Sequence, residues 1–220
     1  MSKQFLIVLA VIVVVFIGVF ALGSHKPNNT NSNTPSHNVI GEGQDGVTLV
    51  EYGDFQCPYC GEYYATVKQV QQQYNTQMVF QFVNFPLTSI HQNAFAGARA
   101  AEAAAQQGQF WPMHDLLYQQ NQVYYDSNET ASTWINSTNP ITYFDQYAKQ
   151  LGLNLTEFNS AYSSNAVDNT INSDMNKGNK LGVNATPTFY LDGKQIMPTN
   201  SVSSFETYIN AAIASKTHSS

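Results

Sequence analysis

Charged residues are scarce in this chain of 220 residues. They make up 11% of it, and nine basic against fifteen acidic residues give a net charge of −6, whereas about a quarter of a soluble domain is usually charged. No cluster of lysine or arginine occurs, so the chain lacks the positive surface with which proteins bind nucleic-acid backbones. Hydrophobic residues reach 43% and aromatic residues 13%, which excludes a charge-rich disordered chain.

Cysteine is scarcer still, with two in the whole chain. Two cysteines cannot build a disulfide-dense scaffold, nor a zinc site made of cysteines alone. Both belong to one motif, Cys57-Pro58-Tyr59-Cys60. Whatever chemistry they perform, they perform it as a single pair.

The most apolar segment lies at the start of the chain. Within residues 1–23, positions 5–22 are an unbroken run of apolar residues and glycine. A helix of that length rises about 27 Å, close to the hydrocarbon thickness of a bilayer. We expect an N-terminal transmembrane anchor. The alternative is a signal peptide that is cleaved after Ala21-Leu22-Gly23. Both predict export, and the anchor predicts a single-pass protein of the cell membrane with its folded domain on the extracytoplasmic side.

The remainder divides into a linker and one domain. Residues 24–38 contain no large apolar side chain and predict a flexible polar linker. Residues 39–220 predict one α/β domain. Its strands are expected at 47–52 and 78–83, followed late in the chain by a hairpin of 188–191 and 195–197. Apolar residues recur at helical spacing after Cys57, throughout about 88–181, and again at 202–213. We therefore expect an all-helical insertion between the second strand and the C-terminal hairpin.

The Cys-X-X-Cys motif follows the first expected strand and opens the first expected helix. At a helix N-terminus, free backbone N–H groups and the helix dipole favour a thiolate, which makes Cys57 the attacking group and Cys60 the resolving one. Pro58 suits the first helical turn, where no N–H is needed. A static structural disulfide or half of a zinc site are the alternatives. No further cysteine exists to complete a zinc site, and His91 and His114 lie far off in sequence, so no metal is expected.

Three segments resemble a known family. Residues 49–60, LVEYGDFQCPYC, resemble the active-site strand and helix start of the DsbA-like thiol:disulfide oxidoreductases. The segments Asn84-Phe85-Pro86-Leu87, with His91 after it, and 100–111 are similar to the insertion of the membrane-tethered, Gram-positive-type branch. Residues 182–189 resemble the segment that carries the family's cis-proline. The resemblance covers 47–213 and implies a thioredoxin fold, with Cys57–Cys60 as a redox-active disulfide and no other cofactor.

The resemblance also implies roles for individual residues. Glu51 would be a buried acid beneath the cysteine pair that exchanges protons with Cys60, although its alternation with neighbouring apolar residues also fits a solvent-facing strand position. Thr186–Pro187 would be cis and face the pair, offering backbone groups to a substrate strand. An ordinary proline at the start of a strand is the alternative there. Tyr59, where the best-known periplasmic members carry histidine, would tune the reduction potential.

Other conspicuous side chains in the expected insertion are given structural roles. We expect His91 to cap or pack at the start of its helix, and His114 to be structural as well. Phe110, Trp111 and Met113 are expected in the core of the insertion rather than in a peptide-binding patch.

Together these features predict an exported, membrane-anchored thiol:disulfide oxidoreductase that introduces disulfides into exported polypeptides. A membrane quinone-linked oxidase of the DsbB or vitamin-K-epoxide-reductase type would reoxidise it. A reductase or isomerase of the same fold is one alternative. The other is a non-catalytic peptide-binding or chaperone module with a structural disulfide.

Overall fold

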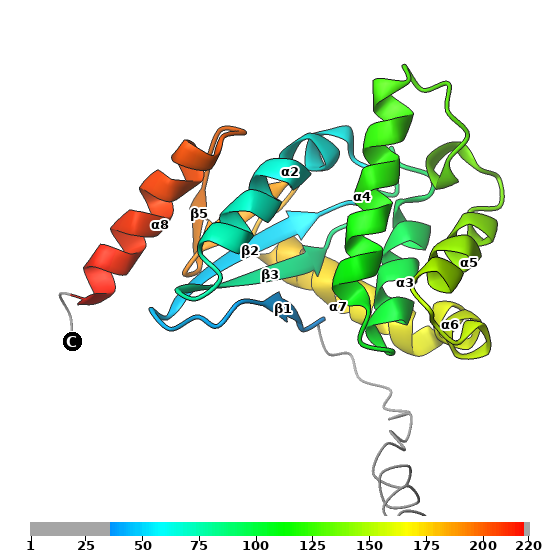
Figure 1. The fold of residues 1–220 in the computed structure, drawn as a ribbon, viewed down its shortest axis with the longest axis horizontal. Coiled ribbons are helices and arrows are strands. Elements are labelled where there is room, and N and C mark those ends of the chain that lie inside the picture. The colour runs from blue at the N-terminus through cyan, green and yellow to red at the C-terminus, as the bar shows by residue number, and fades with distance from the viewer. Residues whose placement is uncertain (1–35, 218–220) are drawn as a thin grey trace, which may run out of the picture. The chain divides into compact units, whose positions relative to one another are not determined.

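The computed structural model describes residues 36–217, and these form a mixed sheet covered by helices (Figure 1). Within these residues the sheet has five strands in the order β1-β3-β2-β4-β5. The central pair β2 and β3 is parallel, and every other neighbouring pair is antiparallel. The strands are β1 (Asn38–Ile40), β2 (Val47–Gly53), β3 (Met78–Asn84), β4 (Thr188–Leu191) and β5 (Lys194–Ile196).

Helices cover both faces of this sheet. On one face, α2 (Pro58–Gln73) and α8 (Val202–Thr217) bury apolar side chains such as Val70 and Phe205 against β2, β3 and β4. On the other face, α7 (Asn165–Lys180) passes behind β3 in Figure 1. Gly178 permits that approach, because a Cβ there would lie 2.6 Å from the ring of Phe85. The sheet is therefore buried on both faces, as its central parallel pair requires.

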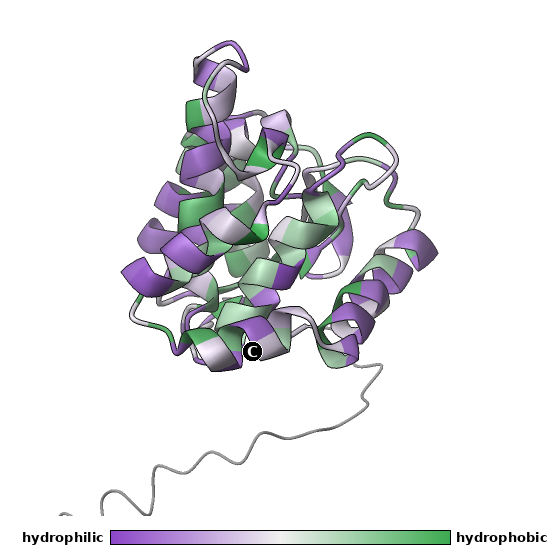
Figure 2. Ribbon diagram, turned by 90° about the vertical axis from the view of Figure 1, so that its right-hand side faces the viewer, coloured by the Kyte–Doolittle hydropathy of each residue, from purple (hydrophilic) through white to green (hydrophobic). Residues whose placement is uncertain are grey.

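The chain between β3 and β4 is helical throughout, as the sequence predicts. It contains α3 (Ala94–Ala105), α4 (Phe110–Asp126), the short 3₁₀ helix η1 (Trp134–Asn136), α5 (Ile141–Gln150), α6 (Leu155–Tyr162) and α7. Buried alanines of α3 let neighbouring helices approach closely, and aromatic residues including Trp134 and Phe144 fill the space between them. Figure 2 views this end of the molecule and shows hydrophilic residues on the outer sides of the helices.

The N-terminal boundary differs from the expectation. Strand β1 was not predicted, so 78–84 is the third strand and not the second. Ser36 and Asn38 fall within the expected linker, but they are buried, and both make side-chain hydrogen bonds to the helical insertion. A three-residue strand is too short to show alternation, and its partners lie far along the chain. The folded domain thus includes residue 36.

The expected N-terminal anchor and most of the expected linker, residues 1–35, lie outside the described residues. Among the described residues, no helix combines the length and the apolar character needed to cross a bilayer. The C-terminal hairpin is close to the prediction, with β5 at 194–196 instead of 195–197.

Candidate active site

The cysteine motif lies at the junction between the end of β2 and the start of α2, as the sequence predicts. Cys57 is the N-cap of α2 and Pro58 occupies its first turn. The backbone N–H of Cys57 donates to the carbonyl of Asp54 at 3.1 Å. From α4, the Asn121 amide donates to the carbonyls of Phe55 at 2.9 Å and Cys57 at 3.1 Å. The turn is thereby tied to the helical insertion.

Two small details keep this turn in place. Gly61 follows the second cysteine, and a Cβ there would lie 2.1 Å from the Oδ1 atom of Asn121, so only glycine fits without displacing that amide. Gln56 accepts from the N–H of Asn93 at 2.7 Å and donates to the carbonyl of Ile135 at 3.3 Å. The residue before the first cysteine is therefore held by two distant parts of the insertion.

The two sulfurs have opposite electrostatic surroundings. Both cysteines are unpaired and buried, with Cys57 4% exposed. A hydrogen bond from Cys60 is the main reason that the pKa of Cys57 is lowered to about 6, against burial, which raises it. Burial raises the pKa of Cys60 well above its ordinary value, and its contact with Cys57 acts in the same direction. At neutral pH this arrangement gives a thiolate at Cys57 and a thiol at Cys60.

The loop before β4 faces the first sulfur. The Thr186–Pro187 peptide is cis, as expected. The Sγ atom of Cys57 lies 3.4 Å from the carbonyl oxygen of Thr186, to which the thiol form donates. The Thr186 hydroxyl is buried and has no hydrogen-bond partner among the described residues. Tyr59, in contrast, is 62% exposed and points away from the core.

Glu51 lies on the α2 face of the sheet, beneath the cysteine pair. Its side chain is buried, and burial together with the negative charge at Cys57 raises the pKa of its carboxyl to about 8. It lines a cavity of about 10 Å³ together with His114 and Tyr118, a volume that suits about one water molecule. Glu51 is thus protonated at neutral pH and placed to supply a proton inside the protein.

Asp54 and His91 form a pair that the sequence did not predict as part of the site. The buried Asp54 carboxylate accepts from the N–H groups of Gln56 at 2.8 Å and Leu87 at 2.9 Å. Its Oδ2 atom lies 2.7 Å from Nδ1 of His91. The only sequence signal for Asp54 was its place three residues before Cys57, and nothing in the sequence linked it to a histidine 37 positions away.

The remaining conspicuous side chains lie in the core of the insertion, as expected. Phe110, Met113 and His114 are buried, and Trp111 is partly buried against the same core. His114 is surrounded by aromatic rings, with those of Phe82 and Tyr118 at 5.0 and 4.9 Å. Burial lowers the pKa of its imidazole.

A second cluster of buried acids lies at the C-terminal end of β3, where Asn84 pairs with Gly53 of β2. The carboxyl of Glu102 accepts from the amides of Asn38 at 2.6 Å and Asn84 at 2.7 Å. The carboxyl of Asp174 accepts from the hydroxyl of Ser36 at 2.6 Å and from the Asn84 amide at 2.9 Å. Asn84 therefore bridges two buried carboxyl groups, and the cluster fastens the start of the described chain to α3 and α7.

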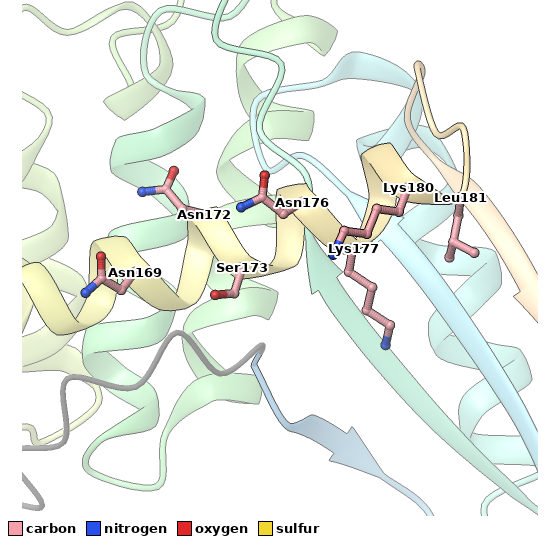
Figure 3. Close-up of a pocket in the computed structure, with 7 residues that line it drawn as sticks. All are labelled: Asn169, Asn172, Ser173, Asn176, Lys177, Lys180 and Leu181. Carbon is pink, nitrogen blue, oxygen red and sulfur yellow. The ribbon is translucent and has the colours of Figure 1, made fainter.

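Two further features of the described residues lie apart from the cysteines. A surface groove of about 630 Å³ runs along α7 and is lined mainly by asparagine and lysine side chains (Figure 3). None of its lining residues contacts the cysteine pair. Within residues 36–217, no group of three histidine, cysteine or acidic side chains is gathered closely enough to hold a metal ion.

Comparison with curated proteins gives matches to longer chains. The chain is 32% identical over 177 residues to a protein named Na(+)/H(+) antiporter NhaA 3 of Salinispora tropica. It is 32% identical over 160 residues to a protein named Na(+)/H(+) antiporter NhaA 1 of Mycolicibacterium gilvum. The matches cover 80% and 71% of this chain but only 25% and 23% of those proteins. The chain thus spans about a quarter of the length of these relatives.

Solved structures with the same fold include redox proteins. BdbD from Bacillus subtilis gives a TM-score of 0.65 at 21% identity, over 83% of this chain and 94% of that one. The Wolbachia pipientis protein α-DsbA1 gives 0.64 at 18%, over 84% and 96%. A thioredoxin-like oxidoreductase from Silicibacter pomeroyi gives 0.60 at 23%, over 83% and 93%. The family described as Thioredoxin matches residues 33–211. With a thioredoxin fold, a helical insertion and a Cys-X-X-Cys pair facing a cis-proline, the chain belongs to the thioredoxin family and has the architecture of its DsbA-type members.

Proposed function

We propose that this protein is a thiol:disulfide oxidoreductase that introduces disulfides into exported polypeptides. The observation that carries the proposal is the split between the two sulfurs. Cys57 caps a helix with its pKa lowered to about 6, while the Cys60 thiol is buried with its pKa raised. Such a split gives one sulfur that reacts as a thiolate and forms and releases mixed disulfides, and one thiol that closes the internal disulfide.

The proposed reaction starts from the Cys57–Cys60 disulfide. A substrate thiolate attacks Sγ of Cys57, the internal S–S bond breaks, and its electron pair moves to Sγ of Cys60. Glu51, protonated and buried, supplies the proton that neutralises Cys60 and regains one from solvent. A second substrate thiolate then attacks the substrate sulfur of the mixed disulfide. The substrate leaves with a disulfide, and Cys57 leaves as a thiolate.

The direction of transfer depends on how strongly the reduced form is stabilised. The pKa of Cys57 falls from 9.0 to about 6, so the folded state gains about 1.4 kcal/mol at pH 7 when Cys57 is reduced. For a two-electron couple this is about 30 mV in the oxidising direction. A disulfide that closes a loop of four residues contributes about 2 kcal/mol to the oxidised form. The two forms should therefore differ little in stability.

A disulfide reductase is the second candidate. The size of the shift at Cys57 favours it, because a pKa of about 6 is nearer to the value of about 7 found in thioredoxin than to the value of about 3.5 in the strongest thiol oxidants.

The placement and the partner form part of the proposal. The apolar run within residues 1–23 would anchor the protein in the cell membrane, with residues 39–220 on the extracytoplasmic side. Reduced exported polypeptides would be the substrates. A membrane quinone-linked oxidase of the DsbB or vitamin-K-epoxide-reductase type would restore the Cys57–Cys60 disulfide, which is the only redox group that the proposal requires.

Redox equilibrium with glutathione and a refolding assay test the function together. We expect the oxidised protein to convert a reduced, unfolded substrate to its disulfide form stoichiometrically, and Cys57→Ser to show none of this activity. Cys60→Ser should accumulate mixed disulfides with the substrate, because the resolving thiol is missing. Reduction of insulin at a higher rate than oxidation of the reduced substrate would favour the reductase. Activity that survives in Cys57→Ser would contradict both.

A further inference from the structure

The Asp54–His91 pair has no part in the exchange steps described above, yet it lies directly behind the reactive cysteine. Asp54 is almost fully buried, and its backbone carbonyl accepts from the N–H of Cys57. Its carboxylate is anchored by two backbone N–H groups and by the imidazole of His91. A buried charge needs such compensation, because desolvation without a partner is costly.

The position of Asp54 is unfavourable for a thiolate. A negative charge in this turn raises the pKa of Cys57, against the groups that lower it. When His91 is neutral, the Asp54–His91 pair has a net negative charge and destabilises the Cys57 thiolate. When His91 is protonated, the net charge of the pair is close to zero. The hydrogen bond to Asp54 is the main reason that the pKa of His91 is raised, and the negative charge at Cys57 adds to it.

The surroundings of His91 leave few other charges to consider. Its loop between β3 and α3, residues 85–93, contains no other titratable side chain. The first turn of α3 has no acidic residue. Among the described residues, Asp54 and Cys57 are the charged groups that act on His91.

We propose that His91 is a positioning residue whose proton accompanies the thiolate of Cys57, so that reduction of the Cys57–Cys60 disulfide binds a proton at His91 in addition to the one at Cys60. Two electrons arrive with two substrate thiolates, which leave as a disulfide. One proton neutralises Cys60, and solvent supplies a second to the neutral fraction of His91. This inference rests on the proposed redox role of Cys57 and Cys60. It adds His91 as the residue that balances the buried charge of Asp54.

The coupling must be reciprocal. If the thiolate raises the pKa of His91, then protonated His91 lowers the pKa of Cys57 by the same free energy. A histidine with only a structural role would hold the loop in place in both redox states and show no such reciprocity.

NMR titration in the full-length protein tests whether the Cys57 thiolate raises the pKa of His91. The Cε1–H resonance, assigned with the His91→Gln variant, is followed from pH 5 to 9 in protein oxidised or reduced by a small-molecule dithiol couple. We expect His91 to titrate at a higher pH in the reduced protein than in the oxidised protein. Equal titration of His91 in the two states would overturn the proposal. Because this experiment needs no polypeptide substrate, its result is independent of whether the protein proves to be an oxidase.

The alkylation rate of Cys57 tests whether protonated His91 lowers the pKa of Cys57. In His91→Gln, which can still donate to Asp54 but carries no charge, we expect the alkylation rate at pH 6 to fall roughly three- to tenfold as the pKa of Cys57 rises. His91→Lys restores a positive charge and should keep the rate near that of the native protein. His37→Gln is the matched control and should change nothing. A native rate in His91→Gln would contradict the proposal. Should that variant fail to fold, His91→Lys assigns the resonance instead and the titration of the native protein decides.

Discussion

Two buried carboxyl groups, Glu51 and Glu102, look alike by burial and differ in their partners. Glu51 is 3% exposed and Glu102 is 7% exposed, and burial raises the pKa of both, to about 8 and about 7. The amides of Asn38 and Asn84 donate to Glu102 and act to lower its pKa, whereas no hydrogen bond among the described residues does so for Glu51. A raised pKa alone therefore does not mark a functional acid. The donors decide whether a buried acid stabilises the fold or is free to exchange a proton.

The largest effect is expected where the one amide shared by both acids of the structural cluster is removed. Asn84→Ala leaves Glu102 and Asp174 without their shared amide donor, and hydrogen bonds to charged groups contribute about 1.5–3 kcal/mol each. We expect the free energy of unfolding to fall by about 3–4 kcal/mol, measured by urea denaturation. Exposed Asn172→Ala on α7 is the control and should stay within about 0.5 kcal/mol. A loss below about 1 kcal/mol at Asn84 would mean that water replaces the amide.

Glu51→Gln should separate stability from activity. A carboxyl whose folded pKa is raised contributes stability that is complete below its unfolded pKa near 4.5 and is lost as the pH rises through about 8. The native protein should therefore lose about 2–3 kcal/mol between pH 5 and 7.5 that the variant does not lose. Denaturation at both pH values, with Cys57→Ser in both proteins to remove the thiolate, measures this difference. With the cysteines intact, Glu51→Gln should slow disulfide exchange, and an unchanged rate would exclude Glu51 as the proton donor.

Glu102→Gln is the matched substitution in the other cluster. A glutamine oxygen can still accept from Asn38 and Asn84, so we expect a loss of no more than about 1 kcal/mol at pH 5. The alkylation rate of Cys57 should be unchanged, since neither Glu102 nor Asp174 is among the groups that shift the pKa of Cys57 or Cys60. If both substitutions slow disulfide exchange equally, the distinction between the two acids is wrong.

The smallest effect is expected at Asp168, a partly exposed carboxylate on α7. Asp168 accepts two hydrogen bonds of 2.6 Å from Arg99, and both side chains are about one third exposed. Arg99→Lys loses the two-pronged geometry but keeps the charge, so we expect a loss of about 0.5 kcal/mol that shrinks in high salt. A loss comparable to that of Asn84→Ala would show that partner number matters more than burial.

The sequence predicted the part of this molecule that depends on neighbours along the chain. Strands expected at 47–52 and 78–83 are observed at 47–53 and 78–84, and the helix after Cys57 and the helical insertion are also present; all of these follow from local apolar periodicity and from turn residues. The burial of Glu51 and the cis peptide at Pro187 came from the resemblance to a family, because alternation alone allowed a solvent-facing Glu51.

What the sequence did not predict depends on partners far apart in the chain. Ser36 and Asp174 are 138 residues apart, and the Asp54–His91 contact spans 37. Each of these side chains alone is an ordinary polar residue in a polar chain, and no periodicity marks it. Strand β1 was missed for the same reason, since three residues carry no pattern until β3 provides a partner.

The contacts of Gln56 impose an order in time on the assembly of the site. The Gln56 side chain can donate its hydrogen bond to the carbonyl of Ile135 only after that residue, 79 positions later, has been added to the chain. A chain synthesised at about 5–20 residues per second needs roughly 4–16 s to add that stretch. During this interval both cysteines have emerged without the helices that shield Cys60, so their sulfurs are open to any other thiol nearby.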